Sequence, residues 1–189
     1  MFAGHFGVAA AIKSKDTRVP FGALLVRTQL IDIIFIPLSI LGIETMEPVA
    51  GGGYGGNLIH ANYSHSLVGT IVIAILLGVL ASRPWGRSGG IAIGFTIFSH
   101  WLLDLVVHRP DLPILPGNLG DFPLLGFGVW EFKLVAIFIE AVLIILGITL
   151  YTKSIVPKVK ERKKAKSIVG TSALGLIMIA LLITDVIGS

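Results

Sequence analysis

The sequence predicts an all-α fold, a polytopic transmembrane helical bundle of about six helices. Three observations support this prediction: the composition, the lengths of the apolar segments and the placement of the basic residues. Of the 189 residues, 54% are hydrophobic and 14% are charged, with a mean hydropathy of +0.89, whereas soluble domains carry about 25% charged residues. The composition excludes a disordered chain and favours an integral membrane protein. The absence of cysteine excludes disulfides and thiolate metal sites.

Apolar segments define the expected helices, because a spanning helix needs about 20 mostly apolar residues. Five segments meet or approach this length. A sixth, at the start of the chain, is short, and it has no basic residue before its apolar run, so it is a poor signal peptide. In chain order the six segments are residues 1–12, 19–43, 64–81, 89–108, 127–151 and 167–187.

The connections between these segments are polar, or rich in glycine and proline. Residues 44–63 include the glycine cluster 51–56, and residues 109–126 include four prolines. The cluster lacks the Gly-Lys-Ser/Thr ending with which a phosphate-binding loop reaches the phosphates, so we interpret it as a flexible outer loop. Gly90 and Gly94 have a spacing that lets helices approach closely, within one chain or between copies.

Basic residues predict the orientation. Residues 13–18, 83–87 and 153–166 contain 12 of the 15 Lys and Arg. Since Lys and Arg accumulate in cytoplasmic loops, we expect these connections inside, both termini outside, and a multi-pass protein of the plasma or inner membrane. We expect one membrane domain over 1–189, in which 1–126 carries the site and 127–189 adds two helices. Its expected partners are membrane lipids and not nucleic acid, and a homo-oligomer or a larger membrane complex stays open.

All five histidines fall on the extracytoplasmic side of this topology. His5 opens the first helix, His60 and His65 lie at the outer start of the third, and His100 and His108 lie in the outer half of the fourth. A single histidine is usually an interfacial or core residue, but five on one side favour a common role.

The fourth helix carries the most informative pattern. His100, Asp104 and His108 are four residues apart and therefore line one helix face. A charged aspartate at membrane depth costs several kcal/mol unless it is paired or solvated, and a divalent metal would offset that cost.

Asp32 lies roughly 21 Å from the inner end of its helix, level with His100. Imidazoles and carboxylates are the usual ligands of catalytic zinc, so we expect one or more Zn²⁺, with Mn²⁺ as an alternative. The candidate ligands are His5, Asp32, His60, His65, His100, Asp104 and His108.

Three charged residues are candidates for catalysis. Glu131 begins the fifth helix from the outside and could act as a ligand or general base. Arg27 or Arg109 could stabilise charge that develops during the reaction. Arg27 could instead form a buried ion pair with Asp32.

The outer start of the third helix offers a different chemistry. Ser64 could cap that helix, and Ser66, beside His65, could act as a nucleophile with a histidine base. Water activated by a metal needs no serine, which favours the metal over the serine.

Taken in order, the motifs are His5, then Gln29-Leu30-Ile31-Asp32, then His60-x4-His65-Ser66, then His100-x3-Asp104. This series resembles the membrane-bound metal-dependent hydrolases, which include the LexA-binding inner-membrane hydrolases, over roughly residues 1–110. Where that family shows Pro-Asp-x-Asp-His, this chain keeps only Asp32, so one ligand of a multi-metal site could be missing. The family is distantly similar to zinc-dependent phospholipases C and single-strand-specific zinc nucleases, and the resemblance therefore implies a phosphoester substrate.

The favoured function is an integral membrane hydrolase that attacks a lipid or lipid-linked phosphoester with a metal-bound hydroxide on the extracytoplasmic side. One alternative is a transporter or a haem- or metal-binding subunit, since intramembrane His and Asp also line ion paths and ligate haem. The inner half holds little polar beyond Arg27, which counts against a continuous path. Another alternative is a non-enzymatic accessory subunit with a structural metal site.

Overall fold

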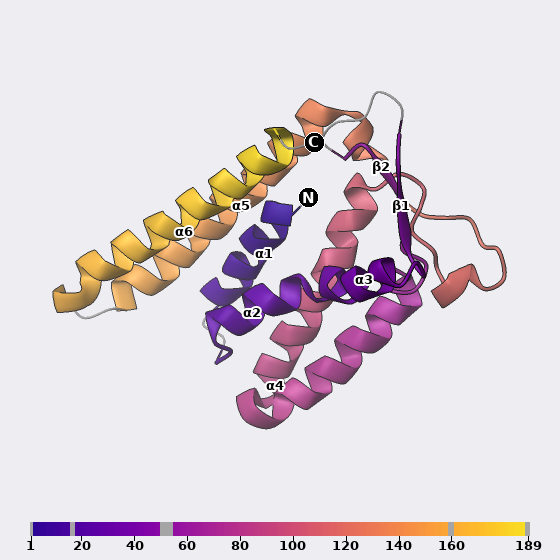
Figure 1. Ribbon diagram of the computed structural model, residues 1–189. Coiled ribbons are helices and arrows are strands. Elements are labelled where there is room, and N and C mark those ends of the chain that lie inside the picture. Colours follow the sequence, from indigo (N-terminus) through magenta and orange to yellow (C-terminus); the bar gives the residue numbers. More distant parts are fainter. Residues whose placement is uncertain (1, 16–17, 50–54, 159–160, 188–189) are drawn as a thin grey trace.

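The structure, a computed structural model, describes residues 2–15, 18–49, 55–158 and 161–187, without the side chains of 161–163. Within these ranges the chain is mostly helical, with one small sheet and three single-turn 3-10 helices. The helices are α1 (Phe2–Ser14), α2 (Phe21–Thr28), α3 (Leu30–Ile40), α4 (Leu67–Val107), α5 (Lys133–Ile155) and α6 (Glu161–Ile187), and the strands are β1 (Thr45–Pro48) and β2 (Asn57–His60) (Figure 1).

The longest element, α4, is a helical hairpin and not a single rod. Gly86 interrupts it with φ 69° and ψ 176°, a conformation that glycine adopts because it has no Cβ, and the chain reverses there (Figure 1). Each arm has about 20 residues and extends roughly 30 Å, the thickness of the hydrocarbon core of a bilayer. The two arms correspond to the predicted helices 64–81 and 89–108.

Small residues let the two arms of α4 pack closely. A Cβ on Gly90 would lie 2.5 Å from the carbonyl oxygen of Gly78, and one on Gly94 would lie 3.0 Å from that of Ala74. The spacing of Gly90 and Gly94 therefore serves packing within the chain.

The predicted helix 19–43 is broken in two. Helices α2 and α3 meet at Gln29 and are bent by 44°. The break is fastened to α1, because Gln29 Nε2 donates to the carbonyl of Phe2 at 3.1 Å and Thr28 Oγ1 donates to the carbonyl of His5 at 3.2 Å. As a result, Asp32 lies in the first turn of α3, beside the start of α1.

The β1–β2 hairpin corrects the all-α prediction. Its strands are antiparallel, with Thr45 opposite His60 and Pro48 opposite Asn57. Four-residue strands within a glycine-rich stretch show too little alternation to be distinguished from an irregular loop. Most of the glycine cluster that we interpreted as a flexible loop, residues 51–54 of 51–56, lies outside the described residues.

Helix α1 occupies the centre of the bundle, with α5 and α6 on one side and α2 and α4 on the other (Figure 1). Its contact with α5 is close, since a Cβ on Gly7 would lie 2.5 Å from the carbonyl oxygen of Leu143. The buried Glu140 of α5 accepts a hydrogen bond from the Gly4 amide at 2.8 Å. This bond satisfies one of the amides that the first turn of a helix leaves unpaired, and it fixes α1 where His5 lies.

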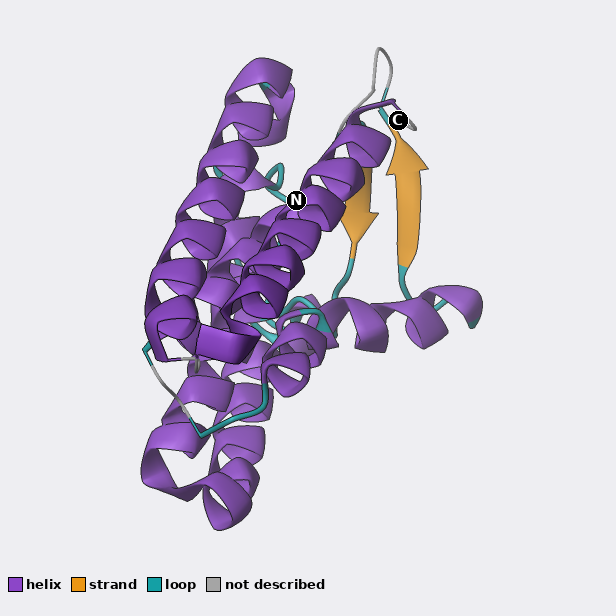
Figure 2. Cartoon of the chain, turned by 90° about the vertical axis from the view of Figure 1, so that its left-hand side faces the viewer, coloured by secondary structure: helices purple, strands orange, loops and turns teal. Residues whose placement is uncertain are grey.

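Among the residues that the structure describes, three helices, α4, α5 and α6, are long and apolar enough to cross a membrane, and the bent pair α2–α3 could provide a fourth span. These helices expose large apolar side chains such as Ile75, Val79 and Phe138. The Gly86 turn and the C-terminal ends of α1 and α5 lie at the lower ends of their helices, and the β hairpin lies at the upper side (Figures 1 and 2). The basic connections thus begin on a common side, opposite the hairpin.

Candidate metal centre

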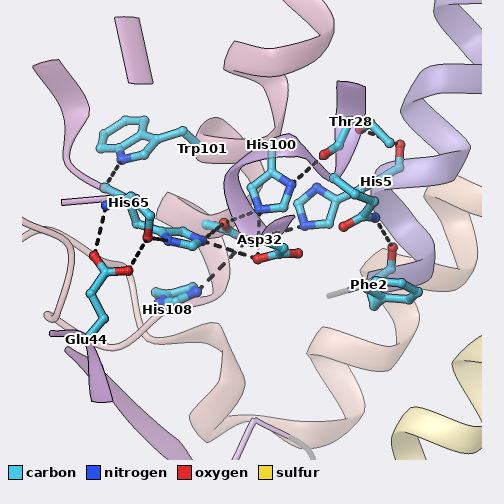
Figure 3. A network of polar contacts seen from close by, with 12 residues as sticks. Phe2, His5, Thr28, Asp32, Glu44, His65, His100, Trp101 and His108 are labelled. Carbon is cyan, nitrogen blue, oxygen red and sulfur yellow. Dashed lines mark hydrogen bonds and ion pairs between the residues drawn. The ribbon is translucent and has the colours of Figure 1, made fainter. Parts of the chain in front are cut away.

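Four segments bring five ionisable side chains together (Figure 3). Helix α1 supplies His5, α3 supplies Asp32, the second arm of α4 supplies His100 and Asp104, and the segment before α4 supplies His65. All are buried except the Asp32 side chain, which is 37% exposed. Two groups have ligand atoms within 4.8 Å of one another and could hold a metal ion: the first is His5, His100 and Asp104, and the second is Asp32, His65 and His100.

The imidazole and carboxylate atoms lie at distances expected of neighbouring ligands on one ion. His100 Nε2 is 3.0 Å from Asp104 Oδ2 and 3.5 Å from Asp32 Oδ1. His65 Nε2 is 3.6 Å from Asp104 Oδ2 and 3.4 Å from Asp32 Oδ1. Two ligands bound to one ion at about 2.1 Å are about 3.0 Å apart at a right angle and about 3.4 Å apart at the tetrahedral angle. In each of these four imidazole–carboxylate pairs, the two atoms are therefore close enough to bind one divalent ion together.

A hydrogen bond behind the His100 ring determines which of its nitrogens carries the proton. His100 Nδ1 is 2.6 Å from the carbonyl oxygen of Thr28. A carbonyl only accepts, so Nδ1 carries a hydrogen, and in the neutral ring Nε2 presents a lone pair. That lone pair faces Asp104 and Asp32, whose ionised carboxylates also only accept. Acceptors that meet in a buried site need a cation between them, either a second proton on the ring or a metal ion.

His65 is oriented in the same way by a buried carboxylate, Glu44. The Glu44 oxygens accept hydrogen bonds from the amides of Tyr63 and Ser64 at 2.7 and 2.8 Å, and from the Ser64 hydroxyl at 2.8 Å. Because Ser64 Oγ gives its one hydrogen to Glu44, it accepts from His65 Nδ1 at 2.8 Å. His65 Nε2 then also presents a lone pair to the cluster. Outer partners of this kind fix the tautomer and the ring orientation of metal-binding histidines.

His108 lies at the edge of the cluster. Its Nε2 is 4.0 Å from Asp104 Oδ1, and its Nδ1 is 2.9 Å from Asp111 Oδ1. The other Asp111 oxygen accepts the Ile59 amide of β2 at 2.9 Å, and the Trp130 ring packs on the His108 ring with centroids 4.4 Å apart. A buried carboxylate and an aromatic ring therefore orient His108 with Nε2 toward Asp104.

Two buried atoms of the cluster have no hydrogen-bond partner among the described residues, Asp104 Oδ2 and His5 Nδ1. The His5 ring stacks on the His100 ring, with centroids 3.9 Å apart and planes 6° apart, and its Nε2 is 3.3 Å from Asp104 Oδ1. Leaving a buried acceptor without a donor costs about 1–3 kcal/mol, and more for a charged group, a cost that a bound cation relieves. Nitrogen and oxygen donors without sulfur suit several divalent ions and do not select one.

A cleft of about 150 Å³ reaches the cluster. Liquid water occupies about 30 Å³ per molecule, so the cleft has room for a small polar group but not for a large ligand. The apolar side chains that line the cleft are Phe2, Phe35, Met46, Ile59 and Trp130.

Four predicted site residues lie away from the cluster. His60 projects from β2, is 39% exposed and pairs with Glu47 at 3.6 Å. Arg109 donates to a backbone carbonyl between β1 and β2, and its Nε is 3.9 Å from Glu131 Oε1. His60, Arg109 and Glu131 do not line the cleft. Arg27 does not line it either. Arg109 and Glu131 thus hold loops together beside the site.

The serine interpretation needs a correction. Ser66 Oγ donates to a backbone carbonyl at 3.0 Å, and it is Ser64 whose hydroxyl contacts His65. Helix α4 begins after Ser66, so Ser64 does not cap it. Asp32 likewise pairs with two histidines and not with Arg27.

Two acidic residues that orient the histidines, Glu44 and Asp111, were not among the predicted site residues. Asp111 follows His108 by three residues at a helix end, a signal that the sequence did contain. Glu44 has no local signal, because its partners lie 19 and 20 residues further along the chain.

Comparison of the chain with protein-family models, with curated proteins and with solved structures gives no match. The function therefore has to be inferred from the site itself.

Proposed function

We propose that this chain is an integral membrane, metal-dependent hydrolase that cleaves a phosphoester of a lipid or lipid-linked substrate. The observation that carries the proposal is the orientation of His65 and His100. Their Nδ1 atoms are held by outer acceptors, and their Nε2 lone pairs converge on Asp32 and Asp104. Metal-binding histidines have this arrangement, and a bound ion would satisfy both imidazole nitrogens and both carboxylates at once.

A divalent ion in such a site would act as a Lewis acid and would lower the pKa of the water bound to it toward 7. The protein's part is to hold the ligands. Asp104 and Asp32 contribute negative charge to balance the ion, and Ser64 and the Thr28 carbonyl keep the two imidazoles in the metal-binding tautomer. Asp32, partly exposed at the cleft, lies where a substrate would enter.

The cleft supports a substrate with a small polar reacting group and an apolar remainder. It is lined by residues of the His/Asp cluster and by apolar side chains such as Phe2, Phe35 and Met46. Such a lining suits a phosphoester at the cluster with lipid chains against the apolar side chains and the bilayer. A haem-binding role is less well supported, because pockets for drug-sized ligands have about 300–1,000 Å³, well above this cleft.

The proposal includes an orientation in the membrane. If the basic connections after α1, within α4 and after α5 are cytoplasmic, then the hairpin lies on the extracytoplasmic side (Figure 1). The cleft lies with it, because Met46 and Ile59 of the hairpin line the cleft. The substrate would accordingly come from the outer leaflet of the plasma or inner membrane.

The test is hydrolysis by the full chain, purified in detergent, stripped with chelator and reloaded with Zn²⁺ or Mn²⁺. The substrates are bis(p-nitrophenyl) phosphate and mixed micelles of phosphatidylcholine, phosphatidylglycerol and phosphatidic acid. We expect hydrolysis that requires the metal, falls at least about 100-fold in His100→Ala and persists in His60→Ala. The latter removes an exposed imidazole outside the cluster.

Metal binding without hydrolysis of any of these phosphoesters would contradict the enzymatic proposal and favour a structural metal site. Equal hydrolysis by wild type and His100→Ala would show that the activity does not arise from this cluster.

A further inference from the structure

A second cavity of the molecule, a groove of about 730 Å³, lies between the two arms of α4. It shares no lining residue with the cleft at the metal centre. On the first arm the lining residues run from Ile71 to Ser82, which is about 17 Å of helix. Half of the hydrocarbon core of a bilayer is about 15 Å thick, so the groove has the length of one leaflet.

The groove has small residues where the arms touch and large apolar residues beside them. Gly78 and Gly90 line it at the contact, since a Cβ on Gly78 would lie 3.0 Å from the carbonyl oxygen of Gly90. Val79 of the first arm and Phe95 of the second arm also line it, and they are 62% and 53% exposed. The described part of the chain therefore leaves these apolar side chains uncovered.

One end of the groove is polar. Ser82 and Arg87 are the lining residues with polar side chains, and they lie on either side of the Gly86 turn. The Ser82 hydroxyl donates to the carbonyl of Val79 at 2.6 Å. Arg87 is exposed and forms no ion pair with the side chains that the structure describes. An unpaired guanidinium thus stands at the end of an apolar groove, at the turn where the α4 hairpin reverses (Figure 1).

We propose that this groove binds an anionic phospholipid, with the phosphate at Arg87 and one acyl chain between the arms of α4. The inference rests on the proposed membrane location and not on the metal centre. The lipid is a bound ligand here and not a substrate, because the groove and the cleft have no residue in common.

Charge favours a lipid over a second copy of this chain as the occupant. A copy in the same membrane orientation would bring its own Arg83 and Arg87 toward the same turn, and like charges repel. An anionic headgroup complements the turn instead. Anionic lipids are concentrated in the cytoplasmic leaflet, and the proposed orientation places the Gly86 turn on that side.

The apolar part of the groove also suits an acyl chain. Lipid tails are as apolar as leucine, so helices in a bilayer have no hydrophobic drive to associate and depend on close packing. A groove whose edges stay exposed fills with the acyl chains around it. The contact with Arg87 then selects which headgroup stays, because basic pockets between helices on the cytoplasmic side bind anionic headgroups.

The experiment is a lipid titration of the full chain, delipidated, stripped of metal and followed by native mass spectrometry in detergent. The probes are dioleoylphosphatidylglycerol and dioleoylphosphatidylcholine, which have the same acyl chains and differ in headgroup charge. We expect one phosphatidylglycerol per chain, bound about fivefold more tightly than phosphatidylcholine, the factor that one basic residue near the membrane surface contributes.

Two pairs of variants locate the site. Arg87→Gln should abolish the preference for phosphatidylglycerol, whereas the control Arg83→Gln removes the same charge from the same turn outside the groove and should keep it. Val79→Trp places a larger side chain in the groove and should weaken the binding of both lipids about 5- to 150-fold. Its control, Leu80→Trp, changes an exposed neighbour that does not line the groove and should bind both lipids like the wild type. Unchanged gel-filtration profiles show that the variants are folded.

Four results would overturn the inference: equal affinity of the wild type for the two lipids, equal effects of Arg87→Gln and Arg83→Gln, equal binding by Val79→Trp and Leu80→Trp, or a dimer that binds neither lipid. The metal-free chain hydrolyses nothing in the proposed mechanism. Failure of the lipid site therefore leaves the proposed hydrolase standing, and an inactive metal centre leaves the lipid site standing.

Discussion

Substituting Ser64 by alanine removes the hydroxyl that joins Glu44 to His65. The buried His65 Nδ1–H then has no acceptor, and Glu44 loses one of its three donors. A buried donor left without a partner costs about 1–3 kcal/mol. If the ring instead moves its hydrogen to Nε2, it can no longer bind a metal. Since each 1.4 kcal/mol is a factor of ten, Ser64→Ala should weaken metal binding about 5- to 150-fold.

The assay is a competition titration between the detergent-solubilised chain and a chromogenic zinc chelator. Ser66→Ala is the matched control: Ser66 is two residues away and equally buried, but its hydroxyl donates to a backbone carbonyl and does not contact a histidine. We expect the control to bind zinc like the wild type. Equal affinities for Ser64→Ala and Ser66→Ala would refute the role assigned to the Glu44–Ser64–His65 chain.

Three further predictions concern stability and orientation. Gly90→Ala should lower the free energy of unfolding by about 1–3 kcal/mol, because the added Cβ would meet the Gly78 carbonyl. Thermal unfolding in detergent measures this change. The control Gly22→Ala, with open space around the added Cβ, should have little effect. Glu140→Ala should cost about 1–3 kcal/mol by leaving the Gly4 amide without its acceptor, measured by the same unfolding assay, and an unchanged melting curve would contradict the role given to this contact. Because the chain has no cysteine, single cysteines report orientation: a membrane-impermeant maleimide should label Glu47→Cys in intact cells and Arg83→Cys only after permeabilisation, and the reverse pattern would contradict the proposed orientation.

Helical periodicity accounts for the part of the site that could be predicted. His100, Asp104 and His108 are spaced so that any helix places them on one face, and the depth of Asp32 follows from counting residues along its segment. The sequence could also indicate that His5 and His65 lie on the same side as these residues, because the basic connections order the segments. Helical spacing and the placement of the basic connections can therefore suggest that these residues lie near one another in the fold.

Contacts between distant segments account for what was not predicted. Glu44 reaches Ser64 across the hairpin, and a four-residue strand carries no periodicity long enough to reveal that hairpin. The break at Gln29 depends on a hydrogen bond to Phe2 in another helix. Local propensity contains none of this information. His60 illustrates the opposite error, since its residue type and position suggested a ligand but its strand directs it toward Glu47.

The most direct test of the metal centre is elemental analysis of the purified chain in detergent without chelator, with an absorbance spectrum of the same sample. We expect at least one zinc or manganese per chain in the wild type, loss of that metal in Asp104→Asn, and retention in Asp121→Asn, which changes an exposed aspartate in a loop. A wild-type protein that binds neither metal, or that instead shows the Soret band of haem, would contradict the account.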